Sequence, residues 1–459
     1  MFHRLLLIIL LGSSVHSHAQ EPRPNILFIC VDDLNDWAGY LKGHPQSITP
    51  NLDQFAKEGI TFTRAYCPAP ACNPSRAAIM TGVRPSTSGV YINPQPWRKS
   101  PVLADAETLP QYFRRHGYKA LGSGKVFHGR YPDPASWNAY WPALDQQRPV
   151  DPAPDDLPVN GIPNTRHFDW GPMNVGKEEM GDWQVADWVS SQLQQSHESP
   201  FFLACGFFRP HLPWYAPAEY FDRFPLDKIV LPKVMESDLD DIPQPGLDMI
   251  NMKDHENVTR YKQWKKAVQG YLVSIHFMDD CLGKVLEALR ASDHAGNTIV
   301  VLWSDHGWNL GEKHHWRKFA LWENTTRTNL IIKRPGSMRM GLQCDQPVNL
   351  LDVYPTLLSL AGLPPNDKNE GTDLTPLLDH PNMQWLTPSI TTHGKDNHAV
   401  RLGNWRYIHY ADASEELYNL KSDVHEWTNL ADVEAYQDIK AQLKKHLPSV
   451  NVDATMVDR

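Results

Sequence analysis

The chain has 459 residues, which is enough for one large α/β domain with a small companion or for about three domains of average size. Its 44 Lys and Arg against 53 Asp and Glu give a net charge of −9, which argues against a nucleic-acid-binding protein, because such a protein needs a basic face. Taken alone, the same charge also argues against a strongly anionic substrate. With 10% aromatic and only 21% charged residues, the composition excludes a disordered chain.

The first 19 residues have the pattern of a secretory signal peptide. Arg4 gives a short positive region, an apolar run follows from Leu5 to Leu11, and small residues lead to Ala19, so we expect cleavage before Gln20. The apolar run is too short to span a bilayer, and the alternative is an uncleaved N-terminal anchor. We therefore expect a periplasmic or secreted protein with no membrane span after cleavage.

The sequence pattern alternates strands and helices. Near-continuous apolar runs of strand length predict buried strands at 25–31, 118–121, 201–207 and 298–303. Capping and turn residues predict helices between them, the longest over 267–289, where apolar residues recur at helical spacing. This order is typical of an open α/β sheet, in which ligands bind beyond the carboxyl ends of the strands.

Side chains able to do chemistry follow each predicted strand. They are Asp32 and Asp33 after the first strand, Lys125 and His128 after the second, His211 after the third, and Asp305 and His306 after the fourth. Adjacent carboxylates repel each other unless a cation lies between them, and oxygen ligands with one imidazole suit a hard divalent ion. The alternatives are a solvated turn for the first pair and a helix cap for His306. Because two such pairs end parallel strands, we favour a metal site.

Cys72 stands at the start of a predicted helix, where Pro74 suits the first turn. Unpaired N–H groups at a helix N-terminus attract an anion, and the Arg76 guanidinium adds a bidentate partner for an oxyanion. A structural cysteine is the alternative, and the residues alone leave both open. Three other cysteines lie in apolar runs or a helical pattern and are expected in the core, namely Cys30, Cys205 and Cys281.

The segment around Cys72 resembles the signature of the type I sulfatases, since it reads Cys72-Asn73-Pro74-Ser75-Arg76 with Thr81-Gly82 after it. In that family a separate maturation enzyme converts the cysteine to formylglycine. Further blocks between residues 24 and 432 resemble the family in the same order, among them PNILFICVDDL, GKVFH, FFRPHLPW, SDHGWNLGEKHHWRK and SEELYNLKSDVHEWTNLA. GKVFH and SDHGWNLGE are most similar to the iduronate-2-sulfatase-like branch.

The resemblance implies the alkaline-phosphatase-like fold of sulfatases, an α/β fold with a large, mostly parallel sheet flanked by helices. The catalytic domain would cover residues 20–385, after the signal peptide at 1–19, and a small antiparallel α+β subdomain would cover 386–459. A strand-like piece over 405–410 and a helical stretch over about 434–447 agree with that division.

The resemblance also implies a calcium site and the catalytic groups around it. The implied metal ligands are Asp32, Asp33, Asp305, His306 and the modified Cys72. The implied catalytic residues are Cys72 as formylglycine (3-oxoalanine), Arg76, Lys125, His128, His211 and Lys318. Arg76, Lys125 and Lys318 would hold the sulfate oxygens. His211 would protonate the leaving oxygen, and His128 would take up a proton when the covalent sulfate is expelled.

The implied substrate is a sulfated carbohydrate, with 2-O-sulfated uronates and algal glycans both open. We expect contacts to it from Trp97, His315, Trp316 and His398, while core packing is the commoner role of tryptophan. With a divalent cation added to its basic side chains, the implied site is locally positive in an acidic protein, so the global charge does not exclude an anionic substrate.

Two alternatives to a sulfatase stay open on the sequence. One is a phosphatase or phosphodiesterase of the same superfamily, whose members typically use Ser or Thr as nucleophile with two metals. The other is a non-catalytic protein that binds sulfated glycans, if Cys72 is never matured.

Overall fold

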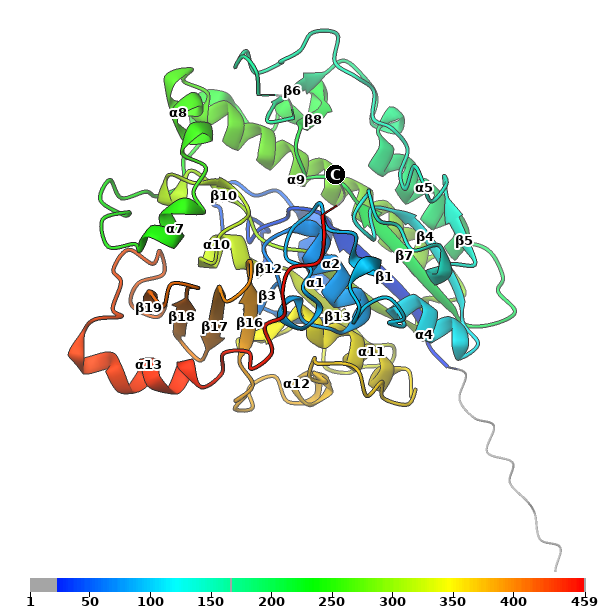
Figure 1. Ribbon diagram of the computed structural model, residues 1–459. Helices are drawn as coiled ribbons and strands as arrows, with labels where there is room; N and C mark the ends of the chain where they lie inside the picture. The colour runs from blue at the N-terminus through cyan, green and yellow to red at the C-terminus, as the bar shows by residue number, and fades with distance from the viewer. Residues whose placement is uncertain (1–22, 166, 458–459) are drawn as a thin grey trace, which may run out of the picture.

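A large mixed sheet forms the centre of the molecule, as the computed structural model shows for residues 23–165 and 167–457 (Figure 1). Its strand order is β14-β2-β13-β9-β1-β7-β4-β5. The predicted signal peptide lies outside the described residues, and its cleavage stays a prediction. Among the helices of those two ranges, none has the length and apolar character needed to cross a membrane.

Parallel pairing dominates this sheet, as predicted. The parallel strands around its centre are β1 (Asn25–Val31), β4 (Lys119–Gly124), β5 (Ala139–Trp141), β7 (Phe201–Phe207) and β9 (Thr298–Ser304). Beyond β9 lie the short strands β2 (Ile60–Phe62), β13 (Leu330–Lys333) and β14 (Leu342–Cys344). Of these, β13 runs antiparallel to both β9 and β2. The four predicted strands are confirmed, and the short edge strands are additions to them.

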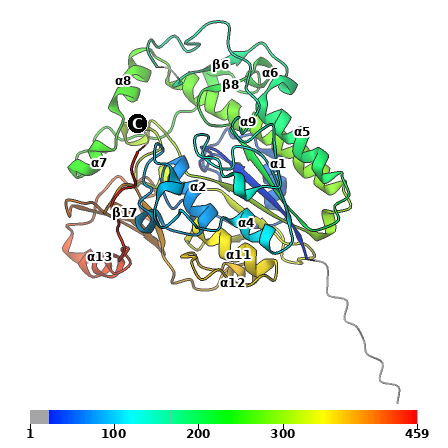
Figure 2. The same cartoon turned by 45° about the vertical axis from the view of Figure 1, so that its right-hand side comes forward.

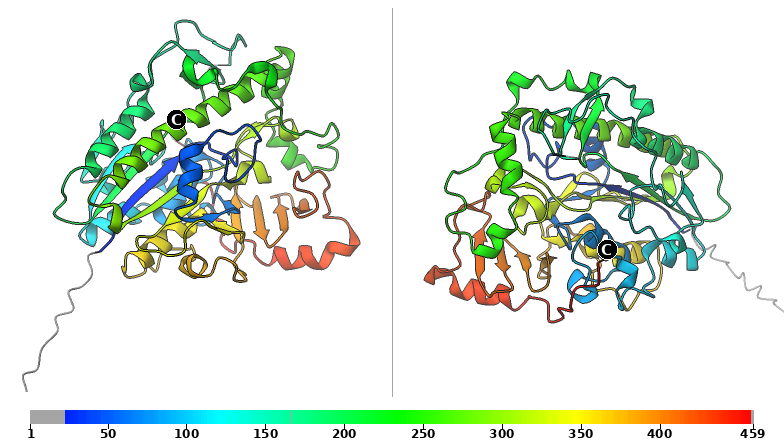
Figure 3. Two further views of the ribbon diagram at one scale, coloured as in Figure 1. Left: turned by 180° about the vertical axis from the view of Figure 1, so that it is seen from behind. Right: turned by 45° about the horizontal axis from the view of Figure 1, so that its top comes forward.

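Helices cover both faces of the sheet because β1 alternates its side chains between two cores. Leu27, Ile29 and Val31 face the core under α1 (Pro50–Ala56), α5 (Gly181–Leu193) and α9 (Trp264–Arg290). Ile26 and Phe28 face the core over α2 (Cys72–Thr81), α4 (Leu109–Arg115), α11 (Val353–Leu360) and α12 (Thr375–Asp379). Figures 2 and 3 show the two helix layers from other sides. This layered arrangement confirms the predicted fold.

Short elements connect these layers. The remaining helices are α3 (Pro85–Ser88), α6 (Ala218–Phe221), α7 (Gln244–Asp248), α8 (Met252–Arg260) and α10 (Glu323–Thr326). The remaining strands before the C-terminal part are β3 (Ala65–Tyr66), β6 (Trp170–Met173), β8 (Trp214–Pro217), β10 (Asn309–Leu310), β11 (Trp316–Arg317), β12 (Arg327–Thr328) and β15 (Val348–Asn349).

The C-terminal part is a separate antiparallel sheet beside the large one (Figure 1). Its strands are β16 (Ser389–Thr392), β17 (His398–Leu402), β18 (Trp405–His409) and β19 (Glu415–Asn419), followed by α13 (Gln437–Lys444). The antiparallel α+β character is as predicted, and the predicted boundary at 385/386 falls shortly before β16. The chain then returns to the catalytic part, where Val452 N–H donates to Ser86 O at 2.9 Å.

Candidate active site

The carboxyl ends of β1 and β9 bring the two predicted carboxylate pairs into one cluster. The strands are adjacent and parallel, so Asp32 and Asp33 leave β1 beside Asp305 at the end of β9. Asp33 N–H donates to Asp305 Oδ1 at 3.1 Å. All three carboxylates are fully buried. Charges buried so completely need partners, and α2 provides the first of them.

Arg76 ties α2 to both strands. Its Nε donates to Asp305 Oδ2 at 2.8 Å and its Nη2 to Asp32 Oδ1 at 3.2 Å. Ser75 Oγ donates to the carbonyl oxygen of Asp305 at 2.6 Å. Burial opposes the charge on Arg76, but Asp305 and Asp32 hold its pKa well above the usual value. These contacts explain the Ser-Arg pair of the signature, which fixes Cys72, the first residue of α2, against the strand ends.

Two lysines converge on the Cys72 sulfur. Lys318 Nζ lies 2.9 Å from Sγ and 2.6 Å from Asp33 Oδ1. Lys125, which follows β4, places Nζ 3.8 Å from Sγ and pairs with Asp32. Both lysines are buried, so their charges act at low dielectric close to the sulfur. An anionic group at Cys72 would therefore meet two ammonium groups.

The loop that carries Lys318 holds an unusual backbone conformation. Residues with φ between 50° and 80° are Lys313, His314, Arg317 and Phe319. Left-handed backbone is costly for side chains of this kind and persists only where surrounding contacts impose it. His315 Nε2–H donates to Lys318 O at 2.7 Å, and Phe319 N–H donates to Pro70 O at 3.0 Å. These contacts hold the loop in the conformation that aims Lys318 at Cys72.

His306 and His211 each present one ring nitrogen to the cluster. His306 Nδ1–H donates to Gly307 O at 3.0 Å, so the Nε2 lone pair faces Cys72 Sγ and Asp33 Oδ1, each 3.4 Å away. His211 Nδ1–H donates to Leu212 O, which leaves its Nε2 3.9 Å from Asp33 Oδ2. Burial, followed by Lys318 for His306 and Lys125 for His211, holds both pKa values well below the usual range.

His128 lies at the margin of the cluster. Its Nδ1 is buried and has no hydrogen-bond partner within the described residues. Burial and the charge of Lys125 lower the pKa of His128 to about 3, so the ring is neutral. Among the described residues, no hydrogen bond or ion pair joins the ring to Cys72 or to a carboxylate, so the neighbouring charges act on it through space.

The residues fit a divalent cation. Ligand atoms of Asp32, Asp33, Cys72 and His306 all lie within 4.8 Å of one another. Asp33 Oδ2 is fully buried and accepts no hydrogen bond from any described residue, and the His306 tautomer points a lone pair at the same space. The predicted ligand Asp305 is adjacent, with its oxygens engaged by Arg76 and Asp33 N–H. An orphaned buried oxygen beside a free imidazole lone pair is what a metal ligand set requires.

The pKa values of the cluster reflect the deep burial of its carboxylates. Burial raises the pKa of Asp33 to about 7 and that of Asp305 to about 6. Burial also opposes ionisation of Asp32, but Lys125, His211 and Arg76 hold its pKa well below the usual value. A cation at Asp33 would keep these carboxylates ionised.

The four predicted substrate-contact residues are buried, and their contacts with other parts of the protein explain their positions. Trp97 is 1% exposed, stacks on Phe127 at 5.6 Å and donates Nε1–H to Tyr131 O. Trp316 is fully buried, contacting Phe168 edge to face. A ring enclosed on all sides has no face left for a sugar, so the structure corrects the prediction for both tryptophans.

The two predicted substrate histidines have structural partners as well. His315 accepts Asn251 N–H at Nδ1 and donates to Lys318 O, so both ring nitrogens are occupied. His398 lies in β17, and its Nδ1 contacts Thr392 Oγ1 at 3.0 Å. Burial lowers the pKa of each ring to about 4, which keeps both neutral. His315 therefore positions Lys318. The contact of His398 with Thr392 does not support the predicted role of His398 in substrate binding.

Sequence reasoning missed the support behind Cys72. Asn73 N–H donates to Asn93 Oδ1 at 3.0 Å, and its Nδ2 donates to Gln95 O at 2.7 Å. Gln95 Nε2 in turn donates to Thr455 O at 2.6 Å, near the end of the described chain. On the opposite side, Tyr271 Oη donates to Asp33 O at 2.7 Å. The variable position of the signature, Asn73, is thereby braced by the C-terminal segment.

Comparisons with known proteins agree with this geometry. The family model described as "Sulfatase" matches residues 24–363, and a second, "N-sulphoglucosamine sulphohydrolase, C-terminal", matches residues 311–453. A protein named "Sulfatase" from Formosa agariphila is 40% identical over 94% of this chain and 87% of its own length. Iduronate 2-sulfatase of Homo sapiens is 30% identical over 77% of this chain and 72% of its own length.

A solved structure shows the same fold. The phosphonate monoester hydrolase from Silicibacter pomeroyi superimposes with a TM-score of 0.77 at 22% identity, covering 94% of this chain and 96% of that one.

These findings place the chain in the sulfatase family. It is a sulfuric ester hydrolase, and the iduronate-2-sulfatase-like branch is one of several branches among its relatives.

Proposed function

We propose that this sulfatase is exported and hydrolyses sulfate esters of a carbohydrate at a formylglycine derived from Cys72. The observation that carries the proposal is the convergence of Lys318 and Lys125 on Cys72 Sγ, beside carboxylates held by Arg76. Export is supported by the leader pattern of residues 1–19. A carbohydrate is supported by a relative named for iduronate, which is a uronic sugar.

Calcium would be held by Asp32, Asp33 and His306, with Asp305 beside them, because these side chains supply hard oxygen ligands and one free imidazole nitrogen. When present, the ion supplies positive charge next to the reacting oxygens, and formylglycine at position 72 supplies the nucleophilic oxygen. Three basic side chains balance the three carboxylates, so the ion makes the site net positive for an anionic ester.

Each side chain then has one task. Lys318 and Lys125 bind sulfate oxygens as charge develops on them, since both ammonium groups face position 72. His211 Nε2 faces the same space and, in the imidazolium form that the negative charge of a bound ester favours, gives its proton to the leaving oxygen. Lys318 is the second candidate for this proton transfer. His128, neutral and with a free Nδ1, accepts a proton when sulfate leaves.

The protonation state of the Cys72 thiol supports the proposal that Cys72 acts after conversion to formylglycine. Burial and then the charge of Asp32 raise the pKa of the thiol above its usual value. A protonated thiol is a poor nucleophile, so unmodified Cys72 is not activated for attack on sulfur. The formylglycine-generating maturation enzyme is therefore part of the proposal as a partner.

Peptide mass analysis of Cys72 from protein made in its native host tests the proposal together with a sulfate-release assay. We expect the mass of an aldehyde at position 72 and loss of turnover in Cys72→Ala with the circular dichroism spectrum unchanged. Cys67→Ala is the matched control, because Cys67 is equally buried and lies outside the cluster. An intact thiol in fully active protein, or unchanged turnover in Cys72→Ala, overturns the formylglycine mechanism.

The same assay separates the phosphatase alternative. The described residues contain one group of metal-ligand side chains, and the position facing it is a cysteine, whereas that alternative calls for a hydroxyl nucleophile and two metals. We expect aryl sulfate to be hydrolysed faster than the matching aryl phosphate. A preference for the phosphate ester overturns the sulfatase assignment of this site.

A further inference from the structure

His211 lies on the open side of the cluster around Cys72. Its side chain is 20% exposed, against 8% for Lys125 and 4% for Lys318. In the proposed reaction the two deeper lysines bind sulfate oxygens, so the leaving oxygen faces the side on which His211 lies. The His211 ring makes one hydrogen bond among the described residues, from Nδ1–H to Leu212 O. One bond to the next residue leaves the imidazole free to turn about that bond, so the ring needs a further restraint.

Packing on Phe208 provides this restraint. The centroids of the Phe208 and His211 rings lie 4.6 Å apart, with the ring planes inclined by 36°. Asp182 on α5 fixes the backbone beside Phe208, since its Oδ1 accepts Phe208 N–H at 2.8 Å and its Oδ2 accepts Arg209 N–H at 2.7 Å. His211 N–H donates back to Phe208 O at 2.8 Å. Phe208 and His211 are therefore the two ends of one turn after β7, and their rings are in contact.

The Arg148 guanidinium packs on the same phenyl ring. Its Cζ lies 3.8 Å from the Phe208 ring centroid, which is a stacking distance. Arg148 Nη1 lies 3.3 Å from Asp151 Oδ2, and Arg209 Nη2 lies 2.8 Å from the same oxygen. Gly181 N–H donates to Asp151 Oδ1 at 2.8 Å. Because Asp151 is itself held from two sides, the guanidinium presents a fixed, flat face to Phe208.

The segment that carries Arg148 is attached to the segment after β4. Gly124 N–H donates to Gln147 O at 3.0 Å, and Gln147 Nε2 donates to His128 O at 3.4 Å. Gln147 is buried and has a φ of 59°, a left-handed conformation that persists where surrounding contacts impose it. Lys125 Nζ lies 5.3 Å from the Phe208 ring centroid. The segments that follow β4, β5 and β7 therefore meet at the Phe208 ring.

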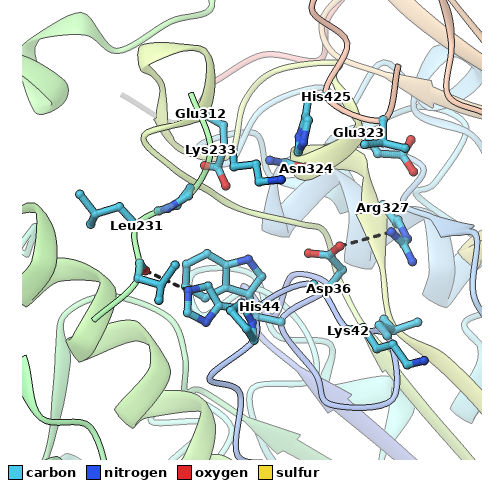
Figure 4. A pocket seen from close by; sticks show the side chains of 17 residues that line it. Asp36, Lys42, His44, Leu231, Lys233, Glu312, Glu323, Asn324, Arg327 and His425 are labelled. Carbon is cyan, nitrogen blue, oxygen red and sulfur yellow. Dashed lines mark hydrogen bonds and ion pairs between the residues drawn. The ribbon is translucent and has the colours of Figure 1, made fainter. Parts of the chain in front are cut away.

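The cavity of about 400 Å³ that Figure 4 shows has no part in this arrangement. Residues of the loops after β1 and β19 line it, among them Asp36, Lys42 and His425, and none of the groups that act on the ester does so. Asp36 Oδ2 pairs with Arg327 Nη1 at 3.2 Å, and the Lys42 amine points away from the cavity (Figure 4). The contacts that bear on proton transfer therefore lie at Phe208.

We propose that Phe208, held in place by Arg148, positions the His211 ring for proton transfer to the leaving oxygen. This rests on the proposed function, in which His211 gives its proton to that oxygen. The S–O bond to the leaving group breaks as sulfur passes to the nucleophilic oxygen at position 72. The leaving oxygen keeps the electron pair of that bond and takes the proton from Nε2. A ring turned away from this oxygen gives its proton less readily, so the bond breaks well only where the oxygen is stable as an anion.

Two aryl sulfates with different leaving groups test the proposal. The phenolate of 4-nitrophenyl sulfate leaves without a proton, whereas the more basic oxygen of phenyl sulfate needs one. In Phe208→Leu we expect kcat/KM to fall by about tenfold for phenyl sulfate and by less than about twofold for 4-nitrophenyl sulfate, because only proton transfer is weakened. Phe208→Tyr keeps the ring and should recover the phenyl sulfate activity. Arg148→Ala should show the same selective loss to a smaller extent, whereas a merely structural role lowers both rates alike.

His211→Ala separates this proposal from the function on which it rests. It should show the selective loss in full, and Phe208→Leu should add nothing to it in the double variant. Equal losses with both esters in His211→Ala overturn the assignment of His211 as proton donor, and the positioning role with it. A selective loss in His211→Ala, together with no selective loss in Phe208→Leu, overturns the positioning role alone. If Phe208→Leu does not fold, Arg148→Ala decides by the same ratio of rates.

The matched control is Arg115→Ala, because Arg115 also packs on an aromatic ring. Its Cζ lies 4.6 Å from the Tyr112 ring centroid, and its side chain is exposed on α4. Both rates should stay unchanged in this variant. A loss there that matches the loss in Arg148→Ala overturns the proposal, since it would show that removal of any such arginine lowers the rates.

Discussion

Two clusters of buried charge among the described residues have the same charge composition and differ in the neutral groups that lie beside the charges. The nucleophile cluster surrounds Cys72 at the ends of β1 and β9. The subdomain cluster joins the C-terminal sheet to the catalytic part and consists of Asp238, Lys313, Glu323, Arg401, Arg406 and Glu426. Each set contains three carboxylates and three basic side chains.

In the subdomain cluster every charge meets an opposite charge. Arg406 Nε lies 2.7 Å from Glu426 Oε1, its Nη2 pairs with Glu323, and Lys313 Nζ lies 2.8 Å from Asp238 Oδ1. In the nucleophile cluster, Asp33 Oδ2 accepts no hydrogen bond from the described residues, while a neutral His306 points a lone pair beside it. The same numbers of charges thus stabilise the contact between the C-terminal sheet and the catalytic part in the subdomain cluster, and form a reactive site in the nucleophile cluster. Each cluster holds a buried carboxylate oxygen without a hydrogen bond from the described residues, Asp33 Oδ2 in one and Glu426 Oε1 in the other. The distinguishing feature is therefore the Cys72 sulfur with the neutral His306 ring beside it.

Removal of the metal gives the largest expected difference between the clusters. Chelation should lower the sulfatase kcat by about 10³-fold or more, because the ion supplies several kcal/mol of charge stabilisation. It should also lower the unfolding free energy by about 2.7 kcal/mol relative to protein with free metal at 100 times its Kd. Thermal unfolding and turnover, with calcium added back, measure both effects. An Asp33→Asn variant should show no response to chelator, and a full response there contradicts the assigned ligand set.

Lys318 and Lys313 provide a matched pair on one loop, since both are buried and paired with carboxylates. Lys318→Ala should lower kcat by about 10²–10³-fold, as expected for loss of one group that stabilises a developing oxyanion. Lys313→Ala should leave kcat unchanged in the folded protein and lower the midpoint of urea unfolding, because Asp238 loses its partner. Steady-state kinetics and urea titrations of both variants decide the matter. A large kcat loss in Lys313→Ala would remove the distinction between the clusters.

The pH dependence of stability separates the clusters through Glu323. Burial opposes ionisation of Glu323, but Arg406 and Arg401 hold its pKa at about 2, against 4.5 as the usual value. A depressed folded pKa contributes stability that is present above pH 4.5 and lost as the pH falls toward 2, in total about 3 kcal/mol. Glu323→Gln should therefore be less stable than wild type at pH 6, and the difference should shrink below pH 4.5. A constant difference across that range contradicts the assignment.

The sequence predicts the scaffold of the nucleophile cluster well for a physical reason. β1 and β7 are buried on both faces, so their apolar runs are unbroken and their ends are sharp. Polar residues that follow such runs closely, Asp32 and His211 among them, emerge near the shared edge of the sheet. The short strands β2, β13 and β14 lack that signal because they have only three or four residues each.

The contacts that aim the catalytic side chains could not be predicted in the same way. Trp97 and Trp316 flank segments of the site, and their aromatic rings suggested stacking on a sugar. Only their burial and packing partners in the structure show that they are core residues. The sequence suggests that the His315 imidazole contacts substrate, but its hydrogen bonds to Asn251 and Lys318 can be seen only in the tertiary structure. The subdomain cluster is invisible in the sequence, since its residues extend from Asp238 to Glu426 without a local pattern.

His315 tests whether orientation of Lys318, beyond its charge, sets the nucleophile cluster apart. His315→Phe removes the donor to Lys318 O and should lower kcat on the order of tenfold with little change in KM, because Lys318 loses its aim. His315→Gln keeps a donor of similar reach and should recover part of the loss. Steady-state kinetics of the two variants measure the split. Equal losses in both, or a change confined to KM, would instead fit general loosening of the loop or contact with substrate.

Gln95 gives the smallest expected effect and shows how far uncharged support of the cluster extends. Its Oε1 accepts Tyr91 N–H at 2.6 Å and Ile92 N–H at 2.8 Å, while its Nε2 donates to Gly89 O and Thr455 O. Gln95→Glu keeps the shape and both acceptors but sets an oxygen against two carbonyl oxygens, which costs about 1–3 kcal/mol. Because Gln95 O holds Asn73 beside the nucleophile, we expect kcat of Gln95→Glu to fall by a few-fold as well. Gln95→Met should lower stability by loss of the hydrogen bonds, without placing an oxygen against the two carbonyl oxygens. If Gln95→Glu changes only the unfolding midpoint and kcat is untouched, the brace is structural and the cluster depends on its charges alone.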